Sequence, residues 1–375
     1  KEYKLRIVKK MLKTVAFFLT FHSVLGINVI DTILTDAMNK YETEDYFTGL
    51  QFSYLPYNAT ESIYTNVGFT SNAKTQAVDS ETLYGWGSIT KEFVTSMLFN
   101  LQGEGLFTLT DTLQDIVPDF FELPSSDNEG SDSMPAWPSA WKSVKLYQLL
   151  NMTSGIPDYL QVIAILVKED RFPSWAKLVN INYTLEQIMT YVVDFQNTQL
   201  DLCHEIKFCF PPGSKYNYSN TSYVIAGLIA EYYFKSPLED LFNDKILPHV
   251  GQNGQAYYAH KELPSDIAAK VADGYSDILY PSIPKGGNGT NWSWSLMGPV
   301  GGLIGDGGAL GSLVKALFNG KIVDETLTSQ YYNDYFVNIE NGELVEDKRT
   351  GCPNYCYGLG VSYRWSPNVG DLFFY

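Results

Sequence analysis

The chain has 375 residues, of which 45% are hydrophobic and 15% aromatic. This composition is ample for a buried core in one large or two closely packed domains, and it excludes a disordered chain. The formal net charge is −16, and no basic cluster follows residue 13. An acidic surface repels phosphate backbones, so the charge excludes nucleic acid as a partner.

Residues 1–26 predict a signal peptide. Basic residues precede the apolar stretch TVAFFLTFHSVLG, which is too short to span a bilayer and has the length of a signal-peptide core. Val24 and Gly26 are small enough for cleavage after Gly26. An uncleaved anchor and an amphipathic first helix are the alternatives. We expect a periplasmic or secreted protein with no stable membrane span once the leader is removed.

The next segments predict a helix, a hairpin and a second helix. Residues 27–44 carry apolar side chains at helical spacing. The aromatic and β-branched stretches 47–57 and 61–70 are separated by turn residues, as in a β-hairpin. The extended piece TLYGWG then leads into a helix over 88–105, whose first residue, Ser88, can act as the cap.

The middle of the chain predicts mainly helices, and strands return at the end. Residues 108–295 contain helical patterns around a Pro, Ser, Asp and Gly-rich loop, 124–139. After residue 296 a glycine-rich stretch approaches a helix, and YGLGVSYRW and DLFFY read as paired strands. We therefore expect an α+β fold in which an antiparallel sheet built from both chain ends is flanked by helices. The sheet part would comprise 27–107 and 296–375, and 108–295 would form an inserted, mostly helical domain.

The four cysteines form two close pairs along the chain: Cys203 with Cys209, and Cys352 with Cys356. In an exported protein an even count of this kind suggests two short-loop disulfides. A four-cysteine zinc site would favour two-residue spacings, which neither pair has. Free buried thiols remain a further alternative.

The stretch GWGSITKEF places Lys91 three residues after Ser88. A serine hydroxyl needs a base within hydrogen-bond reach to become a nucleophile, and residues three apart share a helix face. A lone S-x-x-K is commonly only a helix cap followed by a solvated lysine. Here Gly85 and Gly87 permit close backbone approach, and Lys91 lies among apolar positions, where desolvation would lower its proton affinity.

A second motif, YNYSN, follows Pro211-Pro212-Gly213 and precedes an apolar helix. Next to a cation, the phenolate of Tyr218 can be stabilised, and Asn220 can orient a lysine or donate to a substrate carbonyl. By itself the tripeptide could equally be a tyrosine packed at a helix start with an asparagine cap. The two motifs together, in this order, favour a catalytic site.

With these motifs the chain resembles the serine β-lactamase and penicillin-recognising D-alanyl-D-alanine peptidase superfamily, in the branch of class C β-lactamases and related carboxypeptidases and esterases. The resemblance runs from about residue 40 to the end, through five stretches in family order. These stretches are GSITKEFVTSMLFNLQGEGLFTLTDTL, LLNMTSGIPDY, PPGSKYNYSNTSYVIAGLIAE, VGGLIGDGGALGSLVKAL and YGLGVSY.

The resemblance implies a role for each residue of the two motifs. Ser88 would form an acyl-enzyme, with Lys91 as its proton partner. Tyr218 would serve as base in acylation and deacylation, and Asn220 would hold the substrate. The substrate would be a small molecule or peptidoglycan peptide carrying an amide, β-lactam or ester, and the reaction would need no metal or organic cofactor.

A third family motif, Lys or His followed by Thr or Ser and Gly, is expected shortly after YGLGVSY and contributes to the oxyanion hole. The sequence ends at Tyr375 without such a triplet, and KGG at 285–287 stands in the wrong order. We therefore expect the sequence to be a serine hydrolase fragment that is truncated at its C-terminus and lacks the third family motif. The alternative is a penicillin-recognising binding or sensor protein of the same fold with impaired catalysis.

Overall fold

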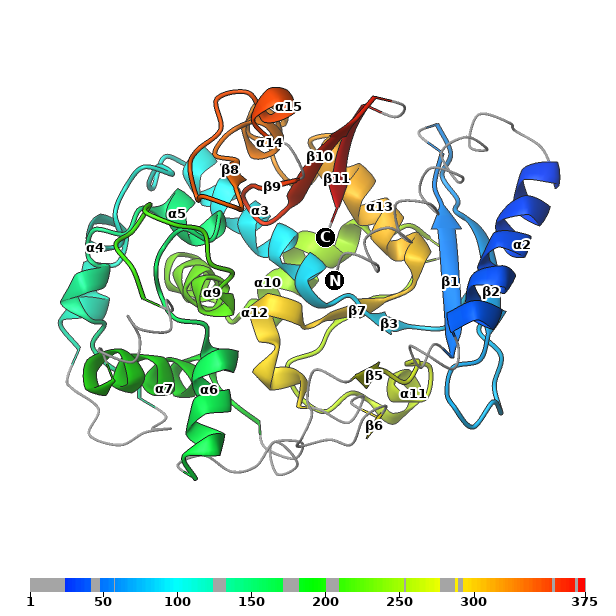
Figure 1. Cartoon of the computed structure of the whole chain (residues 1–375), viewed down its shortest axis with the longest axis horizontal. Helices are drawn as coiled ribbons and strands as arrows, with labels where there is room; N and C mark the ends of the chain where they lie inside the picture. The colour runs from blue at the N-terminus through cyan, green and yellow to red at the C-terminus, as the bar shows by residue number, and fades with distance from the viewer. Residues whose placement is uncertain are drawn as a thin grey trace.

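The structure is a computed structural model of the whole chain (Figure 1). It describes residues 24–41, 48–56, 58–123, 133–170, 182–199, 209–252, 254–276, 287–288, 293–352, 355–367 and 370–374. The predicted leader, apart from its last three residues, lies outside these ranges. The described part begins with helix α2, Val24–Tyr41, so this helix starts three residues before the predicted cleavage point. No helix of the described part is long and apolar enough to cross a membrane.

A β-hairpin follows α2 at one end of the molecule (Figure 1). Strands β1, Gly49–Tyr54, and β2, Ile63–Gly68, pair antiparallel in continuous register. Helix α2 packs on β2, and the buried side chains of Ile30, Leu34 and Met38 form its inner stripe. The predicted hairpin and amphipathic helix are thus confirmed, with small shifts of their ends.

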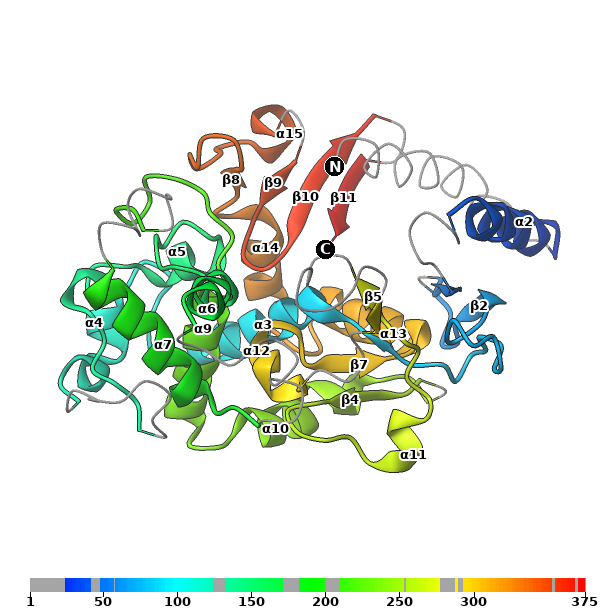
Figure 2. The ribbon, with the colours of Figure 1, turned by 60° about the horizontal axis from the view of Figure 1, so that its bottom comes forward.

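Helix α3, Thr90–Gly103, runs through the centre of the molecule (Figures 1 and 2). Every side chain from Thr90 to Phe99 is buried, because α9, Asn220–Phe234, and α12, Gly298–Gly301, both pack on this helix. The helix ends at Gly103, and Gly105 adopts a φ of 77°, which favours glycine. This central helix carries the residues that follow Ser88.

The middle of the chain is helical, as predicted. Threonine capping boxes begin α4 and α7, in which Thr112 pairs with Asp115 and Thr184 with Gln187. The long helix α9 packs against α3, α5 and α7. The helices of this part are α4 (Leu113–Ile116), α5 (Leu146–Leu150), α6 (Tyr159–Lys168), α7 (Leu185–Thr198), α9 (Asn220–Phe234), α10 (Leu238–Leu241) and α11 (Ser265–Ala268). Short 3-10 or π turns occupy Pro118–Phe121, Ser139–Trp141, Phe242–Ile246, Leu247–His249 and Trp294–Leu296.

A three-stranded antiparallel sheet brings distant parts of the chain together. Its middle strand is β7, Leu303–Gly305, which pairs with β3, Tyr84–Gly85, on one side and β4, Ala256–Tyr258, on the other. Short helix α12, Gly298–Gly301, precedes β7, and α13, Gly307–Phe318, follows it. A two-stranded sheet of β5 (Tyr275–Ser276) and β6 (Gly287–Asn288) lies nearby.

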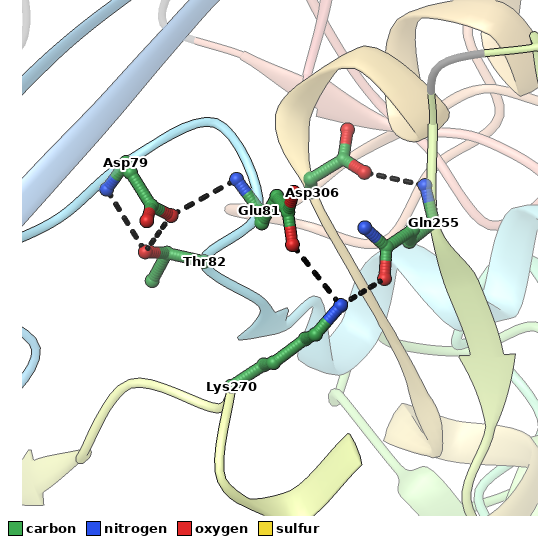
Figure 3. Close-up of polar contacts among 6 residues, drawn as sticks. All are labelled: Asp79, Glu81, Thr82, Gln255, Lys270 and Asp306. Carbon is green, nitrogen blue, oxygen red and sulfur yellow. Dashed lines mark hydrogen bonds and ion pairs between the residues drawn. The ribbon is translucent and has the colours of Figure 1, made fainter. Parts of the chain in front are cut away.

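Hydrogen bonds and an ion pair of side chains connect the segments around this sheet (Figure 3). The Lys270 ammonium donates to Glu81 at 3.2 Å and to Gln255 at 3.0 Å. The backbone N–H of Gln255 donates to the buried carboxylate of Asp306. Asp306 also caps α13 by accepting from Gly308 and Ala309, and it accepts from the Tyr64 hydroxyl of β2 at 2.9 Å.

The C-terminal strands form a four-stranded antiparallel sheet in the order β11-β10-β9-β8. Phe336, Tyr363 and Phe373 pack their rings together beside it. The elements are α14 (Glu325–Asn333), β8 (Val337–Asn338), α15 (Lys348–Gly351), β9 (Cys356–Tyr357), β10 (Ser362–Ser366) and β11 (Gly370–Phe374). The predicted pairing of YGLGVSYRW with DLFFY is confirmed by the β10–β11 register.

The predicted α+β class, with antiparallel strands from both chain ends and helices between them, is confirmed. One detail differs, because the strands from the two ends do not form a single hydrogen-bonded sheet in the described part. The β1–β2 hairpin and the β8–β11 sheet are separate, and it is β3 and β7 that join the two halves. The division into a sheet part and an inserted helical domain stays a prediction.

One of the two expected disulfides is seen directly. Cys352 and Cys356 are bonded to each other. Cys209 is also disulfide-bonded, while Cys203, its expected partner, lies outside the described residues. None of the described cysteines is free and none belongs to a metal-binding group, so the zinc and free-thiol alternatives are not supported.

Candidate active site

Ser88 lies in a 3-10 turn, Gly87–Ile89, between β3 and α3. Trp86 anchors the turn, since its backbone N–H donates to Leu303 at 2.9 Å and its indole Nε1 donates to Gly305 at 3.0 Å. Gly87 takes a φ of 54°, which a side chain would disfavour. The half-buried Ser88 therefore stands at the end of a strand that the three-stranded sheet holds in place.

The prediction that Ser88 caps the helix is wrong. Helix α3 begins at Thr90, and its cap position is Ile89, with no side-chain cap bond. The Ser88 hydroxyl instead accepts hydrogen bonds from other side chains, because tertiary contacts of Trp86 set the turn one step before the helix. The hydroxyl therefore contacts Lys91 and Tyr218 and makes no bond to the end of the helix.

Lys91, the second residue of α3, is fully buried. Its Nζ donates to Ser88 Oγ at 2.8 Å and to the Val300 carbonyl of α12 at 2.9 Å. Burial lowers the pKa of Lys91 to about 7, although the negative charge of Asp158 opposes the change. Near neutral pH this amine can therefore exist without its extra proton and act as a base.

Tyr218 reaches the same serine from the segment before α9. Its hydroxyl donates to Ser88 Oγ at 2.9 Å, and Lys91 Nζ lies 5.0 Å from the centre of its ring. The buried ring of Tyr357 in β9 contacts it edge to face at 5.9 Å. Ser88 Oγ thus lies between an amine and a phenol that come from different parts of the fold.

Asn220 is the first residue of α9, and the structure does not place its amide on Ser88. Its Nδ2 lies 3.3 Å and 3.2 Å from the two carboxylate oxygens of Asp158, to which it donates. Three of the four residues singled out from the sequence therefore meet at one oxygen atom. The fourth is attached to a carboxylate that the two motifs do not contain.

Asp158 is the residue that the sequence analysis missed. It is 5% exposed and caps α6 by accepting from the Leu160 N–H at 3.0 Å. Burial raises its pKa to about 6, while hydrogen bonds from Leu160 and Asn220 and the charge of Lys91 act in the opposite direction. The sequence does contain a helix-start signal, Pro157-Asp158 before an apolar run, but nothing local in it indicates the approach to Lys91.

Comparison with known families shows which family the chain belongs to. The model of the family described as Beta-lactamase matches residues 55–368. This chain belongs to the beta-lactamase family. The match contains all four motif residues and Asp158, and it extends from the hairpin to β10.

Individual members of the superfamily are distant in sequence. A Salmonella agona protein assigned as a D-alanyl-D-alanine carboxypeptidase is 23% identical over 271 residues, which cover 67% of this chain and 56% of that protein. The chain therefore spans little more than half the length of this relative. D-amino acid amidase from Ochrobactrum anthropi SV3, solved with L-phenylalanine amide, superposes with a TM-score of 0.65 at 20% identity, covering 93% of this chain and 83% of that one. The octameric penicillin-binding protein homologue from Pyrococcus abyssi gives 0.64 at 20% identity, covering 91% and 66%.

In this beta-lactamase-family chain the third motif has no assigned residues. The sequence between Tyr363 and Tyr375 contains no Lys/His-Thr/Ser-Gly triplet. Ser88, Lys91 and Tyr218 are joined by hydrogen bonds, whereas a complete oxyanion hole is not defined by the described residues.

Proposed function

We propose that this protein is a serine acyl hydrolase that acts through a Ser88 acyl-enzyme. The observation that carries the proposal is the position of Ser88 Oγ, which accepts hydrogen bonds from both Lys91 Nζ and Tyr218 OH. A hydroxyl with an amine and a phenol in direct contact has a route for its proton, and this is what makes it a nucleophile. Membership of the beta-lactamase family supports the same reading.

In the proposed reaction Ser88 Oγ attacks an acyl carbonyl and its proton passes to the Lys91–Tyr218 pair. The pair then donates a proton to the departing nitrogen or oxygen, which leaves the acyl group on Ser88. A water molecule attacks the ester that has formed, giving up a proton to the same pair, and Ser88 recovers its proton. Asn220, on the edge of the site, would orient the substrate.

We propose as substrates small amides, β-lactams, esters or peptides of the D-alanyl-D-alanine type. The proteins named above as a D-amino acid amidase and a D-alanyl-D-alanine carboxypeptidase support this range. Peptidoglycan is made outside the cytoplasmic membrane, so the proposal includes export of the protein. The alternative function, a penicillin-recognising sensor, would use the same acylation without release of the acyl group.

The experiment is covalent labelling of the 375-residue chain with a fluorescent penicillin, together with hydrolysis of p-nitrophenyl acetate. Wild type should be labelled, and Ser88→Ala should lose the label and lower the hydrolysis rate by roughly 10³-fold or more. Ser96→Ala, a buried serine of the same helix whose hydroxyl bonds to the Glu92 carbonyl, should keep both activities.

Labelling that persists in Ser88→Ala would remove the nucleophile assignment. A stable label on wild type with no turnover would favour the sensor. Absence of both labelling and Ser88-dependent hydrolysis would contradict the proposed function of this chain.

A further inference from the structure

The Asp158 carboxylate joins two helix ends beside the proposed site. It accepts from Leu160 N–H at the start of α6. It also accepts from the side-chain amide of Asn220 at the start of α9. Helix N-termini carry partial positive charge, so this position stabilises an anion in spite of its burial.

The other consequence of this position is electrostatic. Asp158 is 5% exposed and Lys91 is 0% exposed, so water screens little of their interaction. Asp158 is the charged group that counteracts the desolvation of the Lys91 ammonium. The same carboxylate therefore touches Asn220 directly and acts on Lys91 through its field.

We propose that Asp158 is a positioning residue of the Ser88 site, whose carboxylate holds the Asn220 amide in place and whose negative charge governs the proton affinity of Lys91. This inference rests on the proposed serine hydrolase function. Asp158 does not touch Ser88 in the structure and is given no proton-transfer role.

Among the described residues around the buried amine, we assign this role to Asp158 rather than to the other ionisable groups. Tyr218 and Tyr223 face Lys91 with their rings, while α12 contributes the neutral Val300 carbonyl. Burial raises the pKa of Tyr223, and that of Tyr159 beside Asp158, well above the ordinary tyrosine value. Glu92, the next residue of α3, has a pKa raised to about 8 by burial and so is uncharged at neutral pH.

The expected effect on the pH dependence of kcat/KM depends on how many protons the Lys91–Tyr218 pair binds. Ser88 can lose its proton only when the Lys91–Tyr218 pair has one site vacant, and it does not matter which of the two carries the vacancy. A negative charge nearby stabilises the fully protonated pair and raises the pH at which the vacancy appears. Without that charge the vacancy should appear at lower pH, so the acid limb of kcat/KM should move down.

The test is the pH dependence of kcat/KM for p-nitrophenyl acetate, a neutral substrate, in wild type and Asp158→Asn. The acid limb of the variant should lie about one pH unit lower, which raises its activity on that limb, relative to its own plateau, about tenfold. The plateau should fall, because Asn220 loses its ionic anchor. Asp158→Glu, which keeps the charge, should restore the wild-type limb.

Asp324→Asn is the matched control. Asp324 is an exposed carboxylate that caps α14 by accepting from Thr326 N–H, so its loss weakens a helix end without acting on Lys91. Its pH profile should match wild type. A folded Asp158→Asn with a lowered plateau and an unmoved acid limb would show a structural role only and overturn the proposal.

Wild type alone provides a second measurement if Asp158→Asn does not fold. As the pH falls, Asp158 takes up a proton and loses its negative charge, which lowers the proton affinity of Lys91. The acid limb of kcat/KM should therefore be shallower than the curve for a one-proton ionisation. A limb that fits a single proton would contradict the proposal. Hydrolysis that does not depend on Ser88 would instead defeat the proposed function, which separates the two failures.

Discussion

At the scale of single residues, α3 buries two neighbouring ionisable side chains that prefer to be uncharged. Lys91 is 0% exposed and Glu92 is 7% exposed. Desolvation penalises the charged form in each case, which lowers the pKa of the lysine to about 7 and raises that of the glutamate to about 8. Lys91 is the proposed base, whereas the burial of Glu92 should lower the free energy of unfolding.

Glu92→Gln should raise the free energy of unfolding by about 4 kcal/mol at pH 8 and by about 1 kcal/mol at pH 5. The folded protein keeps Glu92 protonated up to about pH 8, while the unfolded chain releases the proton near its ordinary value of 4.5. The folded state thus binds more protons in this window, and stability falls as pH rises through it. The neutral amide removes this dependence.

Urea unfolding at the two pH values measures the effect of Glu92→Gln. The exposed carboxylate of Glu104, just beyond the end of the same helix, provides the control Glu104→Gln, which should follow wild type at both values. An unchanged pH dependence in Glu92→Gln would contradict the assigned burial.

Sequence reasoning at this scale found the residues that a motif keeps close together. Ser88 and Lys91 are one helical turn apart, and their contact follows from helix geometry. Tyr218 was found through a second motif and the family resemblance, because no local rule indicates its contact with Ser88. Asp158 was missed, since its position near Lys91 and Asn220 arises only when α6 packs against α9 and α9 packs against α3.

At the scale of secondary structure elements, the central strand β7 positions the serine. It pairs with β3, which leads into the Ser88 turn, and its Gly305 carbonyl accepts from Trp86. A Cβ on Gly305 would lie 2.4 Å from the Trp86 ring and 2.7 Å from the Gln255 carbonyl. The close approach explains the glycine at this position.

Gly305→Ala should lower the free energy of unfolding by about 1–3 kcal/mol, because the strand and the Trp86 ring must move apart. The displaced turn should also lower kcat/KM for p-nitrophenyl acetate by roughly ten- to a hundredfold. Gly311→Ala in α13 is the matched control, since its Cβ would meet Leu55 at an ordinary 3.4 Å. That change should stabilise the helix by about 0.5–1 kcal/mol and leave activity intact.

Thermal unfolding and initial rates of the two variants check this expectation. Gly305→Ala with wild-type stability and rate would mean that β7 does not hold the turn. The sequence predicted the extended piece TLYGWG and the glycine-rich approach to α13, but not their pairing. Such long-range register is set by the packing of Trp86 and not by local propensity.

At the scale of the whole molecule, the hairpin is joined to the body through α13. Helix α13 packs on β1, Tyr64 donates to Asp306, and the Gly307 N–H donates to Gln51 at 2.7 Å. Asp306 is 0% exposed, so it depends on the Tyr64 hydroxyl and on backbone N–H donors to offset its desolvation. The attachment of the hairpin is therefore polar at its centre.

Tyr64→Phe should lower the free energy of unfolding by about 1–2 kcal/mol, because a buried carboxylate loses a donor. Hydrogen exchange should show faster opening of β1 and β2 than of α3. Tyr54→Phe on β1, where no hydrogen bond of the hydroxyl is found in the described part, should stay within about 0.5 kcal/mol of wild type. Equal exchange in both variants would argue against Asp306 as the attachment point.

The α+β class, the hairpin and the helical middle could all be predicted from periodicity, because these elements depend on local pattern. The assembly of the strands could not. The two chain ends were expected in one sheet, whereas in the described residues only β3 and β7 bridge the halves. Which strand edges pair depends on tertiary contacts such as those of Asp306, and the local sequence pattern does not indicate these contacts.

The burial of Lys91 creates a stability–activity trade-off within one helix. Its folded-state pKa lies below that of the unfolded chain, so its contribution to stability grows as pH rises from about 7 toward 10.5, opposite to the trend of Glu92. The two trends meet between pH 7 and 8, where their combined contribution is lowest. The pH at which the proposed base loses its proton is thus the pH at which Lys91 and Glu92 together contribute least to the free energy of unfolding.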